Sequence, residues 1–243
     1  MNLLLSVIGA LWLVLSAGAV QAKEPCPVPE DLALRNIALP AARRAVADKS
    51  ALTILVLGGT PMAGAMTGDP TTTLPAQLQV ELTDALPGVR VRVVNGAVPR
   101  SSAEATVARM PDRLREIEAR VVIWATGSRE VAMSADLDPF FATLRTGIRT
   151  VRDAGADLIL VDMQYAPSIA RIMNNAPFRA VLLGIAAASD IPILPRYELM
   201  MRWNDDGLLN LDALDPQERQ LVARRLFACL AVALSRPIAA AVR

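Results

Sequence analysis

Histidine is absent from this chain of 243 residues. Because histidine is the side chain best suited to take a proton near neutral pH, its absence argues against hydrolases that activate a hydroxyl with imidazole. Only two cysteines occur, Cys26 and Cys229. Neither lies in a CxxC pair or beside a histidine, which argues against redox catalysis and metal binding. We therefore expect neither a metal nor a cofactor.

Aromatic residues make up only 4% of the chain, whereas hydrophobic residues make up 53%. The core must therefore be built mainly from alanine, leucine, valine and isoleucine. The 25 basic and 24 acidic residues almost balance, so no bulk positive charge favours binding to nucleic acid. The length suits one domain with a substantial core, and we expect residues 23–243 to form it.

The first 22 residues differ from the rest. Residues 3–20 are apolar apart from Ser6 and Ser16, and small residues precede a plausible cleavage point after Ala22. This pattern predicts a signal peptide at residues 1–22. Because about 18 apolar residues is also the lower limit for a membrane span, an uncleaved anchor is the alternative. Either way the domain is expected to be exported, to the bacterial periplasm or the medium.

In an exported protein, two cysteines near opposite ends of the chain suggest one disulfide. A Cys26–Cys229 bond would tie the N-terminal segment to the final helix, and a loop of that length contributes ~4–5 kcal/mol in the chain-entropy model. The alternative is a pair of buried free thiols.

Apolar runs alternate with helical patterns along the chain. The runs predict strands at about 53–57, 89–94, 120–126, 157–163 and 191–194. Helices are expected at about 31–48, 74–86, 101–117, 138–154, 178–189 and 215–234. The predicted N-caps of three of them are Ser101 or Ser102, Asp138, and Asp215. This order favours an α/β fold in which helices cover both faces of a parallel sheet, with the second and fifth strands at its edges.

Ligands of such sheets bind beyond the carboxyl ends of the strands. We therefore expect a site made from the loops at 58–64, 95–102, 127–130 and 162–167, together with the segment before the last helix. Several of these loops resemble the motifs of the SGNH (GDSL-type) hydrolases. The matching segments are VLGGTPMAG (56–64), VVNGAVPRSSA (93–103), VVIWATGSRE (121–130), DLILVDMQYAP (157–167) and FACLAVAL (227–234).

The resemblance is greatest to an exported bacterial subgroup that pairs an N-terminal cysteine with one in the final helix. It implies a flavodoxin-like α/β/α sandwich of about five parallel strands in the order 2-1-3-4-5. It also implies ester or acyl cleavage by a serine with a histidine base and an aspartate, in which glycine and asparagine help to form the oxyanion hole.

The corresponding positions here are altered. Thr60 takes the place of the serine, Pro99 or Arg100 that of the glycine, and Arg129 that of the asparagine. Two alignments of the last segment place either Glu218 and Leu221, or Asn210 and Ala213, where aspartate and histidine belong. A hydroxyl without a general base is a weak nucleophile. We therefore interpret the chain as a catalytically degenerate member, in which Thr60 is a turn residue.

The leading hypothesis for function is non-catalytic binding of an anionic or acylated glycan, or of a protein partner in the cell envelope. The alternative is an esterase or an acyl- or acetyltransferase that uses Thr60 with a non-histidine base. A third possibility is an accessory protein of an envelope polysaccharide or acyl-transfer system. The candidate binding residues are Gly59, Arg100, Arg129, Glu130, Gln164 and Tyr165.

Arg100 and Arg129 suggest a pocket that holds an anion. Alternatively, each arginine pairs with Glu130, Asp162 or solvent. Gln164 and Tyr165 form either a substrate-side wall or a purely structural loop, in which the tyrosine packs and the glutamine bonds to backbone.

Overall fold

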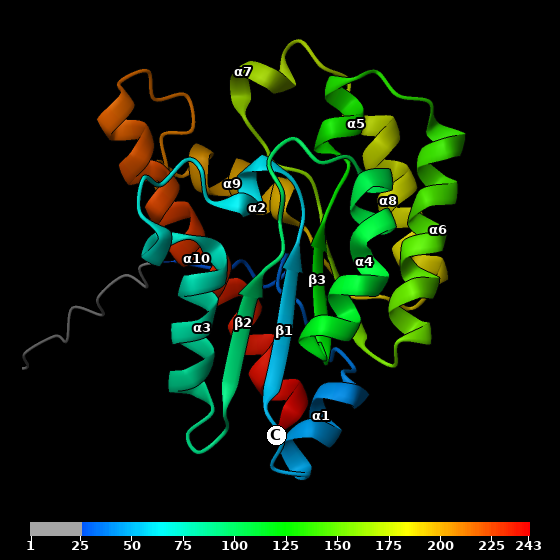
Figure 1. Ribbon diagram of the computed structural model, residues 1–243. Helices are drawn as coiled ribbons and strands as arrows, with labels where there is room; N and C mark the ends of the chain where they lie inside the picture. Colours follow the sequence, from blue (N-terminus) through cyan, green and yellow to red (C-terminus); the bar gives the residue numbers. More distant parts are fainter. Residues whose placement is uncertain (1–25) are drawn as a thin grey trace, which may run out of the picture.

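The computed structural model describes residues 26–243, and the predicted signal peptide or anchor lies outside them. Five parallel strands form one sheet in the order β2-β1-β3-β4-β5, as the resemblance implied (Figure 1). The strands are β1 (Leu52–Leu57), β2 (Val91–Asn95), β3 (Val121–Ala125), β4 (Asp157–Val161) and β5 (Ile193–Leu194). The predicted edge positions of the second and fifth strands are confirmed.

The central strand β1 is buried along its whole length. Ile54 and Val56 enter the core on one face of the sheet, while Leu55 and Leu57 enter the core on the other. This two-sided burial explains the uninterrupted apolar run in the sequence, since successive side chains of a strand point to opposite faces.

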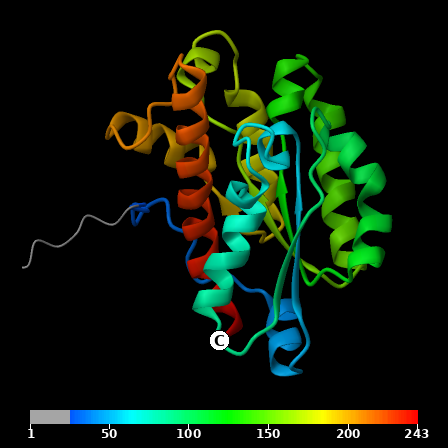
Figure 2. The same ribbon diagram turned by 60° about the vertical axis from the view of Figure 1, so that its left-hand side comes forward.

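Helices cover both faces and complete three layers (Figures 1 and 2). One face packs against α1 (Pro40–Ala47), α3 (Leu74–Ala85), α9 (Arg196–Asp205) and α10 (Pro216–Val242). The other packs against α4 (Ala103–Ile117), α6 (Leu137–Asp153) and α8 (Ala176–Ala188). The remaining helices are short: α2 (Thr60–Ala63), the 3-10 helix η1 (Pro70–Thr72), α5 (Ser128–Ala132) and α7 (Pro167–Ala170). Figure 1 shows α2, α5 and α7 beyond the arrowheads of the strands.

Of the three predicted N-caps, the structure selects Ser102 over Ser101 for the first and contradicts Asp138 for the second. Ser102 caps α4, because its Oγ accepts a hydrogen bond from Ala105 N at 3.1 Å, and Ser101 lies just outside the helix. Helix α6 begins at Leu137 after Asp136, so Asp138 lies within its first turn. The third predicted cap is correct: Asp215 accepts hydrogen bonds from the first turn of α10.

Three of the longer helices differ from the sequence prediction: two in their bounds, and one because it was missed. Helix α1 begins at Pro40 instead of 31, and α9 was not predicted at all. Helix α10 continues eight residues beyond Leu234, because Ile238, Ala239 and Val242 are buried in the core. It is long and apolar enough to cross a membrane by length and composition, yet 67% of its most apolar window is buried inside the domain.

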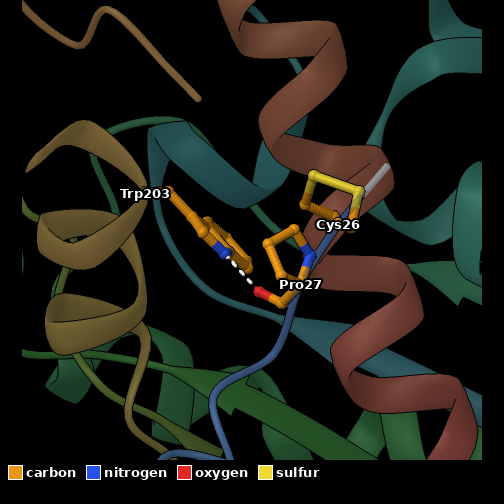
Figure 3. The surroundings of a disulfide bond; sticks show 4 residues. Cys26, Pro27 and Trp203 are labelled. Carbon is orange, nitrogen blue, oxygen red and sulfur yellow. Dashed lines mark hydrogen bonds between the residues drawn. A yellow bond between two sulfur atoms is a disulfide. The ribbon is translucent and has the colours of Figure 1, made fainter. Parts of the chain in front are cut away.

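The two cysteines form the predicted disulfide, which joins residue 26 to the middle of α10 (Figure 3). The neighbouring Pro27 carbonyl accepts a hydrogen bond of 2.7 Å from Trp203 Nε1 in α9. Because Trp203 is fully buried, this contact holds the start of the described chain against the core.

Candidate functional site

A cavity of about 190 Å³ lies at the carboxyl ends of β1 and β3. Residues that follow β1, β2 and β3 form most of its wall, and the start of α9 completes it. Its polar lining includes Thr60, Arg100, Thr126, Arg129, Glu130 and Arg196. This is the end of a parallel sheet at which ligands bind.

Thr60 lies at the start of α2, directly after a tight glycine turn. Gly58 has φ +153°, and a Cβ there would lie 2.9 Å from the Ala125 carbonyl oxygen, so the turn requires glycine. Gly59, at the N-cap of α2, has extended backbone and also lines the cavity. The turn therefore places the half-buried Thr60 side chain at the cavity wall.

Arg100 contacts this threonine through its backbone. Its N–H donates a hydrogen bond of 2.9 Å to Thr60 Oγ1, and its φ of +60° lies in the left-handed region that glycine adopts most easily. Of the two positions matched to the family's glycine, Arg100 is thus the one that supplies an N–H to the hydroxyl. Pro99 has no N–H to give.

Among the described residues, no general base is hydrogen-bonded to the Thr60 hydroxyl. Within residues 26–243, the Arg100 amide is its single hydrogen-bond partner. The carboxylate that lines the same cavity, Glu130, is buried and accepts a hydrogen bond of 2.6 Å from Ala103 N. It therefore satisfies one of the free N–H groups at the start of α4.

The candidate acid positions before the last helix lie away from this cavity. Glu218 and Asn210 are both exposed, and Asn210 Nδ2 donates a hydrogen bond of 2.8 Å to Glu218 Oε1. The two alternative alignments thus pointed to residues that bind each other. Of the positions matched to the histidine, Leu221 is exposed and Ala213 is buried.

Gln164 and Tyr165 also lie outside the cavity lining. The backbone N–H of Gln164 donates to Ser128 Oγ at 3.4 Å, and the residue borders a neighbouring cavity of about 160 Å³. The Tyr165 ring packs edge-on against Tyr197, with ring centroids 5.1 Å apart. The structure therefore brings together Gly59, Thr60, Arg100, Arg129 and Glu130, but not Gln164, Tyr165 or Glu218.

Arg100 and Arg129 are exposed at the rim of the cavity. Neither forms an ion pair with a carboxylate of the described chain, so the suggested pairs with Glu130 and Asp162 are absent there. Nor do residues 26–243 contain a group of three or more acidic, cysteine or histidine side chains placed to hold a metal ion.

Asp162 has a different cationic partner, Arg179. The Arg179 guanidinium donates to Asp162 Oδ2 at 2.9 Å, pairs with Glu198, and lies over the Tyr197 ring. Asp162 Oδ1 accepts a hydrogen bond from Met163 N. Burial raises the pKa of Asp162, although its bonds with Arg179 act in the opposite direction.

Arg196, which also lines the cavity, is not among the binding residues predicted from the sequence. It lies two residues after the end of β5, begins α9 and is only 2% exposed. No hydrogen bond or ion pair joins its guanidinium to another described residue. Burial lowers the pKa of Arg196 to about 10, while the charge of Asp162 raises it, so the side chain stays protonated near neutral pH.

A model of the non-GDSL lipase-like family matches residues 25–243. The chain belongs to this family. The predicted resemblance to SGNH-type hydrolases is thereby confirmed at the level of family and fold.

Individual relatives of this non-GDSL lipase-like protein are distant. Thioesterase 1/protease 1/lysophospholipase L1 of Escherichia coli K12 is 26% identical over 124 residues, which cover 49% of this chain and 59% of the relative. The match therefore spans less than two thirds of that relative's length.

Solved structures show the same fold at low identity. A lipase/acylhydrolase from Enterococcus faecalis has a TM-score of 0.58 at 18% identity, covering 77% of this chain and 96% of that chain. A two-domain esterase active on acetylated mannans has a TM-score of 0.63 at 16% identity, covering 82% of this chain and 55% of its own.

Proposed function

We propose that this non-GDSL lipase-like protein binds a ligand in the cavity beside Thr60 without hydrolysing it. The observation that carries the proposal is the set of contacts of Thr60. Its oxygen accepts a hydrogen bond from Arg100 N, and no base in residues 26–243 is hydrogen-bonded to it. General base catalysis contributes roughly 10²–10⁴-fold, so a threonine without a base is a very slow nucleophile.

Hydrolysis or acyl transfer through Thr60 is the second candidate. One contact favours it: the Arg100 N–H lies 2.9 Å from the hydroxyl, in a place from which it could donate to an oxyanion. Glu130 would then be the base, since it is the carboxylate that lines the cavity. For that role it would have to give up its hydrogen bond with Ala103 N.

The proposed ligand is an anionic or acylated glycan, and the proposed location is the cell envelope. An esterase of the same fold acts on acetylated mannans, which supports a glycan. The disulfide supports export, because disulfides persist in oxidising compartments. An envelope protein partner is the alternative occupant. Residues 1–22 would be a cleaved signal peptide, or a membrane anchor if they are retained.

The test is hydrolysis of p-nitrophenyl acetate by the purified protein, by Thr60→Ala and by Thr60→Ser. We expect all three to match the uncatalysed rate, because serine is a less hindered nucleophile but still lacks a base. Thr146→Ala, which removes an exposed hydroxyl from α6, is the matched control. Turnover that disappears in Thr60→Ala and persists in Thr146→Ala would establish the esterase instead.

A further inference from the structure

Unsatisfied polar atoms gather at the cavity. Within residues 26–243, four buried side-chain atoms have no hydrogen-bond partner: Trp124 Nε1, Thr126 Oγ1, Arg196 Nε and Glu198 Oε2. Two of the four belong to residues that line the cavity, Thr126 and Arg196. Because buried polar groups in native proteins are nearly always bonded to protein, water or ligand, these two atoms are free to bind a polar ligand in the cavity.

Arg196 is the stronger of the two indications. A buried charge is retained in proteins only where a partner compensates for the loss of water. Arg179, which binds Asp162 directly, shows such compensation, because it contacts two carboxylates and an aromatic ring. Arg196 has no such contact in the described chain, so its partner is expected to come from outside.

The charge of the cavity lining identifies the partner as an anion. Three arginines and one carboxylate line it, which leaves two net positive charges. The carboxylate, Glu130, is already engaged by Ala103 N. Only Arg196 among the three arginines is buried, and Asp162 lies close enough to act on its charge. A ligand group with a single negative charge therefore suits the site better than a dianion.

The volume of the cavity further limits which ligand group it can hold. A cavity of about 190 Å³ suits a small acid group better than a whole oligosaccharide. A planar guanidinium matches the two oxygens of a carboxylate, and a hydroxyl can donate a third hydrogen bond. The rest of a larger ligand can leave past Arg100 and Arg129, which are exposed at the rim.

We infer that this cavity is a carboxylate subsite, in which the guanidinium of Arg196 holds the acid group and the hydroxyl of Thr126 assists. The inference rests on the proposed ligand-binding function and specifies the ligand's chemistry. A uronic acid at the end of a glycan is the kind of ligand that combines such a group with the proposed glycan.

The test titrates the purified full chain with sodium acetate and sodium glucuronate at constant ionic strength. Acetamide and methyl glucoside are the matched neutral probes, and sodium phosphate and sulfate test other anions. The readouts are the ¹H–¹⁵N signal of Arg196 Nε and the thermal midpoint. We expect the two carboxylates to shift both readouts saturably and the neutral probes to shift neither.

Variants then locate the binding. Arg196→Met should weaken acetate binding about tenfold or more, and Thr126→Val roughly threefold, because the arginine contributes an opposite charge and up to two hydrogen bonds, whereas the threonine contributes one hydrogen bond. Arg202→Met is the control, since it removes an exposed arginine from the same helix, and it should bind as the parent does.

The inference is overturned if no carboxylate binds, if acetate binds Arg196→Met and the parent equally, or if phosphate or sulfate binds more tightly than acetate. If Arg196→Met fails to fold, the inference is tested by acetate binding to Thr126→Val and by the shift of the Arg196 Nε signal when the parent protein is titrated with acetate. Hydrolysis through Thr60 together with Arg196-dependent acetate binding would refute the proposed function and leave this subsite standing.

Discussion

At the scale of single residues, the half-buried Arg179 and the buried Arg196 are two cations near one buried carboxylate, Asp162. Arg179 bonds directly to Asp162 and Glu198, whereas Arg196 acts on Asp162 only through its charge. Removing one partner of a buried ion pair is strongly destabilising, whereas replacing a poorly compensated buried charge by an apolar side chain is often stabilising. The two arginines should therefore respond in opposite ways to the same substitution.

We predict that Arg179→Met lowers the free energy of unfolding by roughly 3–5 kcal/mol, because Asp162 is then left buried without its cation. Arg196→Met should raise it by about 1–4 kcal/mol in the absence of carboxylates. Urea denaturation in a buffer free of acetate measures both. A loss of stability in Arg196→Met that equals the loss in Arg179→Met would show that Arg196 is a structural partner of Asp162 and not a ligand-binding group.

Only some of the residues that line the cavity could be predicted from the sequence. Thr60, Arg100 and Arg129 follow strands, and the rule for parallel sheets places them at one edge. Arg196 follows a strand too, but that strand has only two residues, and the polar segment after it resembled a loop. The choice between Asn210 and Glu218 could not be made, since the sequence does not reveal that the two are bonded.

At the scale of elements, α1 is held at its start by a residue far away in the sequence. Asp157, the first residue of β4, accepts hydrogen bonds from Ala41 N at 3.2 Å and Ala42 N at 2.9 Å. These are among the N–H groups that a helix leaves free at its start. No side chain of the residue that precedes α1 caps it, so β4 supplies the cap.

Burial raises the pKa of Asp157 above its ordinary value of 3.8, although the two backbone hydrogen bonds act to lower it. A raised folded pKa means that the folded state binds the proton more tightly than the unfolded state. This carboxyl therefore favours folding most when protonated, and its contribution decreases as pH rises from 3.8 through the folded pKa.

We predict that Asp157→Asn removes this pH dependence. Urea midpoints measured from pH 3 to 7 should show the parent losing stability relative to Asp157→Asn as pH rises across that window. Asp190→Asn provides the control, because the Asp190 side chain is exposed and makes no hydrogen bond or ion pair with the described residues. A difference that is flat, or that grows in favour of the parent with rising pH, would contradict the prediction.

The ends of the strands and helices show where the sequence alone is sufficient to predict the secondary structure. The strands and helix α3 were placed to within about two residues at most ends, because their apolar patterns are regular. Helix α1 was predicted too early, since its cap comes from β4 and the preceding segment is tied down by the disulfide. Helix α10 was predicted too short, because its last turns are stabilised by burial that local patterns do not report.

At the scale of the whole molecule, the disulfide closes almost the entire described chain into one loop, with 203 residues of separation. It also lies beside the hydrogen bond between Pro27 and Trp203, so the covalent link and α9 secure the same segment (Figure 3). Helix α9 itself is additionally packed into the core through Leu199 and Met200, which are fully buried.

We predict that reduction of Cys26–Cys229 lowers the free energy of unfolding by about 5 kcal/mol, the chain-entropy value for a loop of this length. Under native conditions, release of the N-terminal segment should also expose Trp203 to solvent and shift its fluorescence to the red.

Acetate binding should persist after reduction, because Leu199 and Met200 keep the start of α9, and with it Arg196, in place. In Trp203→Phe the spectral shift should vanish, whereas Trp124, buried in the opposite core, should report no change. If the unfolding midpoint is the same in the oxidised and the reduced protein, the disulfide does not stabilise the fold and the prediction is wrong.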